Sequence, residues 1–286
     1  MSNKSESFTA VAYRQFKKSK FGIAGFYIVL LLFITSILAL FDLTPFSYTE
    51  GNIENILQPV SSVHWFGTDD LGRDVFSRVV EGSVISLSVG IGAMLISLVI
   101  GVFLGALAGF YGKWVDLLIM QVTDIFLSFP TILFALAVIA IFEETTIATI
   151  IYVLGFLGWP GICRLLRGKI LQVREEEYVA AAKALGMNDF QVIFKHVLPN
   201  AVAPLMVATT VGIAGNILSE AWLSFLGIGV PPPEPSWGRM ISEGQNQLAT
   251  NPEVCIFSGL AIFITVMAFN LLGDGLRDAI DPKLKI

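Results

Sequence analysis

The stretch VISLSVGIGAMLISLVIGVFLGALA, residues 84–108, runs for 25 residues without a charged side chain. A helix needs about 20 apolar residues to cross the hydrocarbon core of a bilayer. Further apolar runs of that length lie near residues 22–41, 117–142, 146–166, 201–226 and 254–274. The sequence therefore predicts six transmembrane helices.

The composition excludes a soluble globule, because 55% of the 286 residues are apolar, only 14% are charged and the mean hydropathy is +0.74. The apolar runs show no alternation of period two and exceed the roughly ten residues of an outer-membrane barrel strand. We therefore expect an all-α, polytopic membrane protein. The first run follows a basic segment but is longer than the core of a signal peptide and lacks a small-residue cleavage site, so we interpret it as a retained span.

The orientation follows from the basic residues, which are enriched on the cytoplasmic side. With the N-terminus inside, the inner segments carry 15 Lys and Arg against three in the outer segments. Both termini are therefore predicted to be cytoplasmic, in a multi-pass protein of the inner membrane. The expected parts are an inner segment 1–21, a first span with an outer loop 22–83, a core 84–274 with an inner loop 167–200 and an outer loop 227–253, and an inner tail 275–286.

No motif points to catalysis by this chain. The phosphate-binding pattern G-x-x-x-x-G-K-[ST] is absent, and no His, Cys, Asp and Glu side chains have metal-ligand spacing. His64 and His196 are assigned to opposite sides of the membrane, and Cys163 and Cys255 to opposite ends of the spans. We therefore expect a non-catalytic chain without a metal or cofactor, and any energy for transport would come from a partner.

A polar segment between the fourth and fifth spans predicts a helix–turn–helix. Residues 175–185 begin with acids and continue with alanines, Gly186 is suited to cap the helix, and Asn188 to begin a second helix that Pro199 would end. Small side chains allow the surface of a partner to approach closely. The segment is interpreted as a docking surface, with an ordinary solvated loop as the alternative.

The same residues resemble the EAA loop in the permease subunits of ATP-binding-cassette (ABC) importers, in which E-A-A, three residues, a glycine and nine residues precede a Leu-Pro end. Ala180 stands in place of the Glu of that pattern, and His196 in place of an apolar residue. The resemblance implies a type I ABC importer permease-like fold in which this loop contacts an ATPase. The implied contact residues are Glu177, Tyr178, Ala180, Ala181, Ala182, Gly186, Leu198 and Pro199.

A narrower resemblance is to the C-type permeases of the dipeptide, oligopeptide and nickel group. It rests on FGTDDLGRDVFSR at 66–78, LSEAWLSFLG at 218–227 and PSWG at 235–238. It implies a peptide importer with a homologous B-type permease, two cytoplasmic ABC ATPases that bind ATP and Mg, and an extracytoplasmic substrate-binding protein as partners in the lipid bilayer. No nucleic acid is expected as a partner. Import of nickel, metal chelates or oligosaccharides is the alternative, and a secondary transporter is the rival class.

The first of these motifs has a local interpretation. Thr68 can cap a short helix in which Asp69 would pair with Arg73 and Asp74 with Arg78, both at i,i+4. The charges would either stabilise this outer segment alone or form a ledge that meets the binding protein or the partner permease.

In the fifth span, Asn216 and Glu220 lie one helical turn apart and share a face. A carboxylate in lipid is costly, so this face is expected to meet a cavity, a partner helix or the outer interface. It would either line or gate the translocation path or serve a structural role.

Glycines and prolines indicate how the spans pack. Gly101, Gly105 and Gly109 recur every four residues and predict a close helix contact, and Pro130 and Pro204 predict bends. An amphipathic helix is expected at about 237–248, with Trp237 at the membrane interface.

Overall fold

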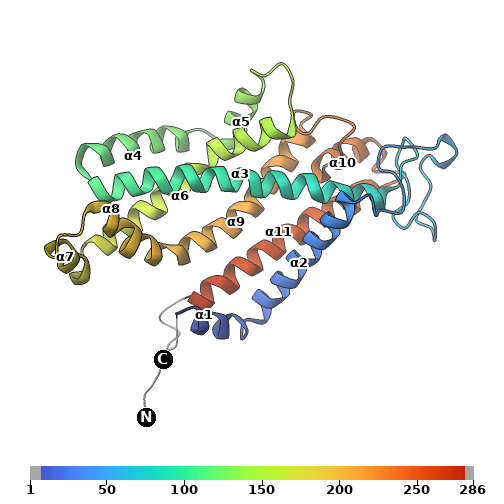
Figure 1. Cartoon of the computed structure of the whole chain (residues 1–286). Coiled ribbons are helices and arrows are strands. Elements are labelled where there is room, and N and C mark those ends of the chain that lie inside the picture. The colour runs from blue at the N-terminus through green and yellow to red at the C-terminus, as the bar shows by residue number, and fades with distance from the viewer. Residues whose placement is uncertain (1–7, 281–286) are drawn as a thin grey trace, which may run out of the picture.

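The computed structural model describes residues 8–280. Residues 1–7 and 281–286, which belong to the predicted inner segments 1–21 and 275–286, lie outside the described residues. The described chain is built from helices, as expected, with one isolated bridge between Thr68 and Asp74 (Figure 1). The elements are α1 Phe8–Phe16, α2 Lys20–Leu40, η1 Ile53–Asn55, α3 Val75–Tyr111, α4 Lys113–Ser128, α5 Thr131–Ile139, α6 Ile147–Arg174, α7 Glu177–Ala184, α8 Asp189–Val192, the π-helical turn η2 Ile193–Val197, α9 Leu198–Phe225, α10 Trp237–Gly244, η3 Gln245–Gln247 and α11 Glu253–Ile280.

Five described helices, α2, α3, α6, α9 and α11, are long and apolar enough to span a membrane. The predicted third span is instead the pair α4 and α5, which bends by 87° and makes a sixth span if the pair is counted as one. The bend falls at Pro130, because a residue before proline avoids helical geometry and Phe129 is accordingly extended. Pro204, by contrast, lies inside the single helix α9.

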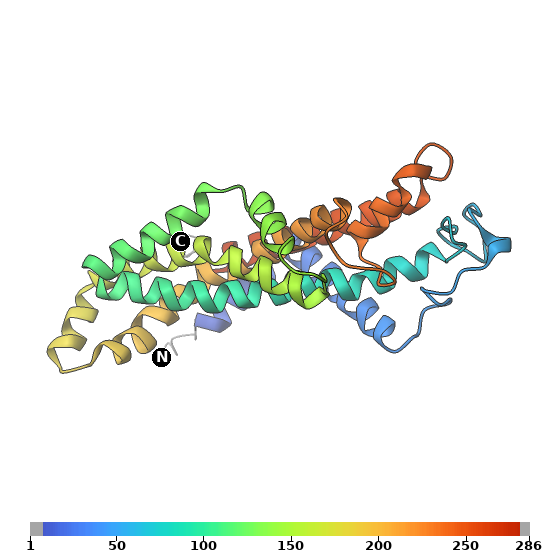
Figure 2. The same ribbon diagram turned by 90° about the horizontal axis from the view of Figure 1, so that it is seen from above.

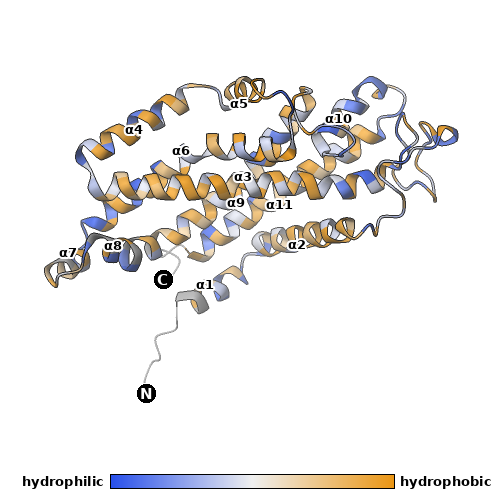
Figure 3. Ribbon diagram, turned by 45° about the horizontal axis from the view of Figure 1, so that its top comes forward, coloured by the Kyte–Doolittle hydropathy of each residue, from blue (hydrophilic) through white to orange (hydrophobic). Residues whose placement is uncertain are grey.

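The helices form one elongated bundle. Figure 1 shows α3 and α6 running along each other, with α9, α11 and α2 on the opposite side from α4. Figure 2 shows the α7–α8 hairpin at one end and the loop that precedes α3 at the other. Apolar residues dominate the long helices between these ends, as Figure 3 shows, so the bundle has the hydropathy profile of a protein that spans a bilayer.

The contact between α3 and α6 depends on the predicted glycines. A Cβ at Gly101 would lie 2.6 Å from the Cβ of Ile162, one at Gly105 would lie 2.7 Å from the carbonyl oxygen of Cys163, and one at Gly109 would lie 2.8 Å from the Cβ of Ile170. These are distances that real Cβ atoms do not tolerate. The glycine spacing therefore correctly predicted a helix contact, and it brings the two backbones together where lipid supplies no hydrophobic driving force.

Substitution of Gly105 by Ala tests this contact. The added Cβ meets backbone atoms of α6, which cannot rotate away, so we expect Gly105→Ala to destabilise the purified protein by about 1–3 kcal/mol. The matched control is Gly168→Ala on α6, where nothing lies within 4 Å and the higher helix propensity of Ala acts alone. Thermal unfolding in detergent measures both, and equal melting temperatures for the two variants would refute the close contact.

Candidate functional site

The inner hairpin, defined here as residues 175–198, has the predicted helix–turn–helix geometry. Inner and outer denote the sides of the membrane that the sequence predicts. Gly186 follows the end of α7 with φ +86°, a backbone conformation that residues with a side chain rarely adopt. The Met187 amide donates to the Ala182 carbonyl and so closes the end of the helix. Asn188 then caps α8, because its side chain accepts from the Gln191 amide at 2.9 Å while the Gln191 side chain accepts from the Asn188 amide at 3.2 Å.

The end of the hairpin differs from the prediction. Pro199 was expected to end the second helix, but it is the second residue of α9. A proline is tolerated in the first turn because the amides there have no partner within the helix. The turn η2 joins α8 to α9 without a break, so the hairpin continues directly into a long apolar helix.

The hairpin has one buried and one exposed face. Val179 of α7 is buried in an apolar cluster that includes Phe110 of α3, Ile170 of α6 and Ala201 of α9, and Ala182 is buried as well. Through this cluster α7 is connected to the end of α6 and, by way of the other members, to α3 and α9, and close-packed side chains transmit strain.

Part of the exposed surface of the hairpin is small and apolar. Ala180, Ala181 and Gly186 are exposed, and nothing lies within 4 Å of the position that a Cβ of Gly186 would occupy. Leu185 between them is 87% exposed. We did not single out Leu185 from the sequence, although an apolar residue beside a capping glycine was the available signal. A large apolar side chain in this position suits a contact with another protein.

At the opposite end of the bundle, an ion-pair cluster joins the outer loop to two helices. Asp69 pairs with Arg73 at 2.7 Å, as predicted, and also with Arg78 at 2.6 Å. Both arginines reach Glu243 of α10, at 3.2 Å and 2.9 Å, and Arg239 pairs with the same carboxylate at 2.8 Å. The outer ledge is thus an interlocked cluster of two carboxylates and three guanidinium groups.

The predicted pair of Asp74 and Arg78 does not form. The helix begins only at Val75, so Asp74 caps α3 by accepting from the Ser77 amide at 2.8 Å, and it contacts Nδ1 of His64 at 2.9 Å. The i,i+4 rule assumes that both residues lie in one helix. Residues 69–74 are not helical, so the Asp69–Arg73 pair forms across a turn, in which the Gly72 amide donates to the Asp69 carbonyl. Thr68 does not cap a helix either, because its segment folds back to form the bridge with Asp74.

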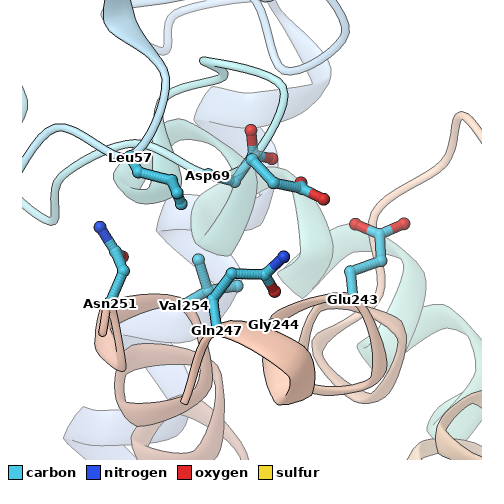
Figure 4. A pocket seen from close by; sticks show the side chains of 8 residues that line it. Leu57, Asp69, Glu243, Gly244, Gln247, Asn251 and Val254 are labelled. Atoms are coloured by element: carbon cyan, nitrogen blue, oxygen red, sulfur yellow. The ribbon is translucent and has the colours of Figure 1, made fainter. Parts of the chain in front are cut away.

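Glu243 is the residue of this cluster that the sequence did not reveal. Burial alone would raise the pKa of its carboxyl group, but Arg78, Arg73 and Arg239 outweigh burial, and the pKa lies below its ordinary value. Figure 4 shows Glu243 and Asp69 beside a small cavity, and its volume of about 10 Å³ is roughly what one water molecule needs. Gln247 Oε1 and Asn251 Oδ1 are buried without a partner among the described residues.

Trp237 was expected at the membrane interface, and the structure shows that its side chain is covered by the protein, with only 1% exposed. Its indole NH donates to the Val79 carbonyl at 2.8 Å, and its ring packs where Gly82 of α3 leaves room. The helix that it begins ends at Gly244, after which η3 continues to Gln247.

Glu220 lies at the centre of a buried group of hydroxyls. Its carboxylate is 0% exposed and accepts from Ser224 at 2.7 Å and from Ser86 of α3 at 3.4 Å. Ser236, which caps α10, donates to Ser224 at 3.4 Å. Glu220 therefore connects α3, α9 and the beginning of α10.

Asn216, one turn before Glu220, lies in a different environment. It borders an open groove of about 310 Å³ between α3, α6 and α9. The lining includes Ser97, Gly158, Gly161 and Gly212. Few large side chains therefore project into this part of the groove, and its lining is partly polar. The shared face that the sequence predicted thus divides into a groove residue and a buried residue.

Comparisons with known proteins agree with this architecture. Residues 101–286 match the family model described as binding-protein-dependent transport system inner membrane component, and residues 7–59 match the N-terminal TM domain of oligopeptide transport permease C. The chain belongs to the family of binding-protein-dependent transport system inner membrane components. This confirms the expectation of an importer permease subunit in a membrane.

Two relatives cover almost the whole chain. A dipeptide transport system permease protein, DppC, of Alkalihalophilus pseudofirmus is 43% identical over 98% of this chain and 93% of its own length. A glutathione transport system permease protein, GsiD, of Pectobacterium atrosepticum is 41% identical over 96% of this chain and 90% of its own.

Two solved structures share the fold. An inward-facing structure of the MetNI methionine ABC transporter has a TM-score of 0.58 at 19% identity and covers 72% of this chain and 97% of its own. A crystal structure of an amino acid ABC transporter with histidines has a TM-score of 0.56 at 14% identity and covers 71% and 94%.

The ion-pair cluster predicts a pH-dependent stability of the outer loop. Because the pKa of Glu243 is lower in the folded protein than its ordinary value near 4.3, its stabilisation is present above about pH 4.3 and is lost as the pH falls through the folded pKa. At pH 7 we expect the backbone amides of residues 51–74 to exchange hydrogen faster in Glu243→Gln than in wild type, because this segment loses about 1–3 kcal/mol of local stability. The exposed Glu54→Gln is the control. A difference between Glu243→Gln and wild type that persists unchanged at pH 3.5 would contradict the assignment.

Glu220 is predicted to support the folded bundle. Glu220→Ala removes the hydrogen-bond acceptor of two buried hydroxyls, whereas Glu220→Gln retains an acceptor oxygen. Each buried hydroxyl without an acceptor lowers the free energy of unfolding by about 1–3 kcal/mol. The melting temperature in detergent should therefore fall in the order wild type, Gln, Ala. An Ala variant as stable as wild type would remove Glu220 from the structural role.

Proposed function

We propose that the chain is the C-type permease subunit of an ATP-driven importer that moves small peptides across the cytoplasmic membrane. The observation that carries the proposal is the inner hairpin, whose exposed small-residue face lies on a buried face packed against three long helices. Such a segment transmits an applied displacement to the spans and holds no chemistry of its own.

The proposed partners are those that the family implies. Two ATPase subunits bind ATP and Mg, and one of them docks on the inner hairpin through Tyr178, Ala180, Ala181, Leu185 and Gly186. The chain itself is non-catalytic and binds no cofactor. A homologous B-type permease completes the translocation path, and a substrate-binding protein delivers the peptide at the outer ledge. This requires the hairpin, and with it both termini, to be cytoplasmic, in agreement with the excess of basic residues in the inner segments.

The mechanism is mechanical. Closure of the ATPase dimer displaces α7, and the packed cluster around Val179 carries that displacement into α3, α6 and α9. Asn216 and the glycine-lined groove beside it face the moving path, while Glu220 and its hydroxyl partners keep the outer ends of α3, α9 and α10 together.

The substrate class is drawn from the relatives. The printed names of the two relatives specify dipeptides in one case and glutathione, itself a tripeptide, in the other. Peptides of two or three residues are thus the substrates to test first, ahead of nickel, metal chelates and oligosaccharides.

Leu185→Glu tests the docking surface. The side chain is 87% exposed, so the substitution leaves the packing of the chain unchanged, but it introduces a charge where the partner docks. We expect recovery of the ATPase subunits with the tagged permease to fall at least tenfold. The control is Leu248→Glu, at a 56% exposed leucine of the outer segment. Normal recovery and normal peptide-stimulated ATP hydrolysis with Leu185→Glu would rule out this docking surface.

The transport activity itself is tested in proteoliposomes that contain the complete complex. Labelled di- and tripeptides should accumulate only with ATP and with the binding protein. Accumulation without ATP, driven by an ion gradient, would identify a secondary transporter instead.

A further inference from the structure

Two segments of the chain are fastened to α3 on either side of Glu81, at the outer end of the bundle. The hydroxyls of Ser36 on α2 and Ser83 on α3 share a hydrogen bond at 2.7 Å, which fixes the end of α2 beside this part of α3. The Phe46 amide donates to the Ser77 hydroxyl at 3.2 Å. The chain that leaves α2 therefore crosses α3 one helical turn before Glu81.

A third segment, the loop between α9 and α10, reaches the same place. A Cβ on Gly82, the residue after Glu81, would lie 3.5 Å from the carbonyl oxygen of Pro235. Glu234 precedes that proline, and Asp42 comes two residues after the end of α2. The fold thus gathers three carboxylates from three separate segments.

The carboxyl group of Glu81 is covered by the protein and has no cation beside it. Glu81 is 9% exposed, and its Oε1 has no hydrogen-bond partner among the described residues. The described groups that act on its charge are Asp42 and Glu234, which oppose it, and the Thr44 hydroxyl, which favours it. A buried carboxylate is costly without a paired cation, so the arrangement lacks a positive group.

Tyr48 lies in the same surroundings. Burial raises the pKa of its phenol above the ordinary value, and the charges of Glu234, Glu81 and Asp42 raise it further. The phenol therefore stays protonated at neutral pH and adds no charge. Asp42, Tyr48, Glu81 and Glu234 are called the acidic site below. Asp42 is exposed and Glu234 is half-buried, so the site can be approached from solvent.

The whole outer end of the bundle has an excess of acids. Twelve Asp and Glu but three Arg lie in the outer segments, which are residues 41–83, 140–146 and 226–253 and are all described. The three arginines belong to the ion-pair cluster, where they pair with Asp69 and Glu243. An excess of one charge attracts the opposite charge over long distances.

The ligand that suits the acidic site is an organic cation. No group of three His, Cys, Asp and Glu in the described part of the chain could hold a metal ion. An ammonium or guanidinium group forms charge-assisted hydrogen bonds with separate carboxylates. A small peptide with neutral side chains has no net charge, so an excess of acids does not attract it from a distance. A basic protein surface is attracted in this way.

We propose that the acidic site receives a lysine or arginine side chain of the substrate-binding protein. The acidic outer end attracts a basic face of that protein, and the acidic site fixes one cation of it. This inference rests on the proposed function, which supplies the partner, and adds the chemistry by which the partner is recognised.

The test measures how fast the binding protein associates with the complete complex in nanodiscs of neutral lipid, without ATP or peptide. The variant Asp42→Asn/Glu81→Gln/Glu234→Gln keeps the side-chain shapes and removes three negative charges. We expect its association rate at low salt to be at least tenfold lower than that of wild type. The difference should shrink as added salt screens the charges.

A matched control separates the acidic site from the general charge of the outer end. Glu54→Gln/Glu143→Gln/Glu144→Gln removes three exposed acids that do not act on Glu81 or Tyr48, and its rate should fall less than threefold. Equal rates for the two triple variants would overturn the proposal. Binding of a labelled dipeptide without the binding protein, lost in the acidic-site variant, would also overturn it, because the cation would then be the ammonium group of the substrate.

A second variant keeps the proposal testable if the substitution at Glu81 disturbs the fold, which the melting temperature in detergent shows. Asp42→Asn/Glu234→Gln leaves Glu81 in place and should still lower the association rate at least threefold, and an unchanged rate would overturn the proposal. Docking is measured without ATP and peptide. A complex that docks the binding protein through the acidic site but accumulates no peptide with ATP would therefore refute the proposed function and support this inference.

Discussion

The close approach of α3 to α6 is the constraint on which the rest of the structure depends. In a bilayer, exchanging contacts with lipid for contacts with another helix gains apolar side chains little free energy. Helices therefore associate where their backbones can approach closely. Gly101, Gly105 and Gly109 allow this over much of α3. The same helix begins at the cap of Asp74, carries Arg78 in the ion-pair cluster and reaches the inner apolar cluster with Phe110. The two ends of the bundle are thereby connected through one continuous helix.

The ion pairs of α6 with α4 and the hydrogen bonds of Glu220 lie near the two ends of the bundle, where they hold helices together. At the inner end, Arg164 and Arg167 of α6 pair with Asp124 and Asp116 of α4, which hold the first half of the broken span against the bundle. At the outer end, Glu220 and its serine partners join α3, α9 and α10. The middle of the bundle is left to apolar contacts and small residues, which slide more readily than paired charges. This division suits a permease subunit of a transporter.

The sequence predicted features that depend on local pattern. The length of an apolar run determines a span, the four-residue spacing of glycines determines a helix contact, and Gly186 followed by Asn188 determines a turn between helices. The 87° break at Pro130 was anticipated as a bend, because the cause lies in the proline itself.

Features set by distant contacts were missed or misassigned. Arg78 and Glu243 are 165 residues apart, so no local rule could pair them, and the i,i+4 rule instead suggested Asp74, which precedes the helix. Trp237 was assigned by the general preference of tryptophan for membrane interfaces, but the absence of a side chain at Gly82 admits its ring into the bundle. Pro199 was interpreted as the end of one helix because its use in the first turn of the next depends on where that helix begins.

The burial of Arg78 also determines how the outer face responds to ionic strength. Dissolved salt screens exposed charges beyond about 10 Å at 0.1 M but acts much less on buried pairs. Arg78 is 0% exposed, and its partner Asp69 is also buried. The outer loop therefore keeps its shape when salt is added. If the rate at which another protein binds this face changes with salt, the change therefore reflects long-range electrostatic attraction between the two surfaces. It does not reflect unfolding of the loop.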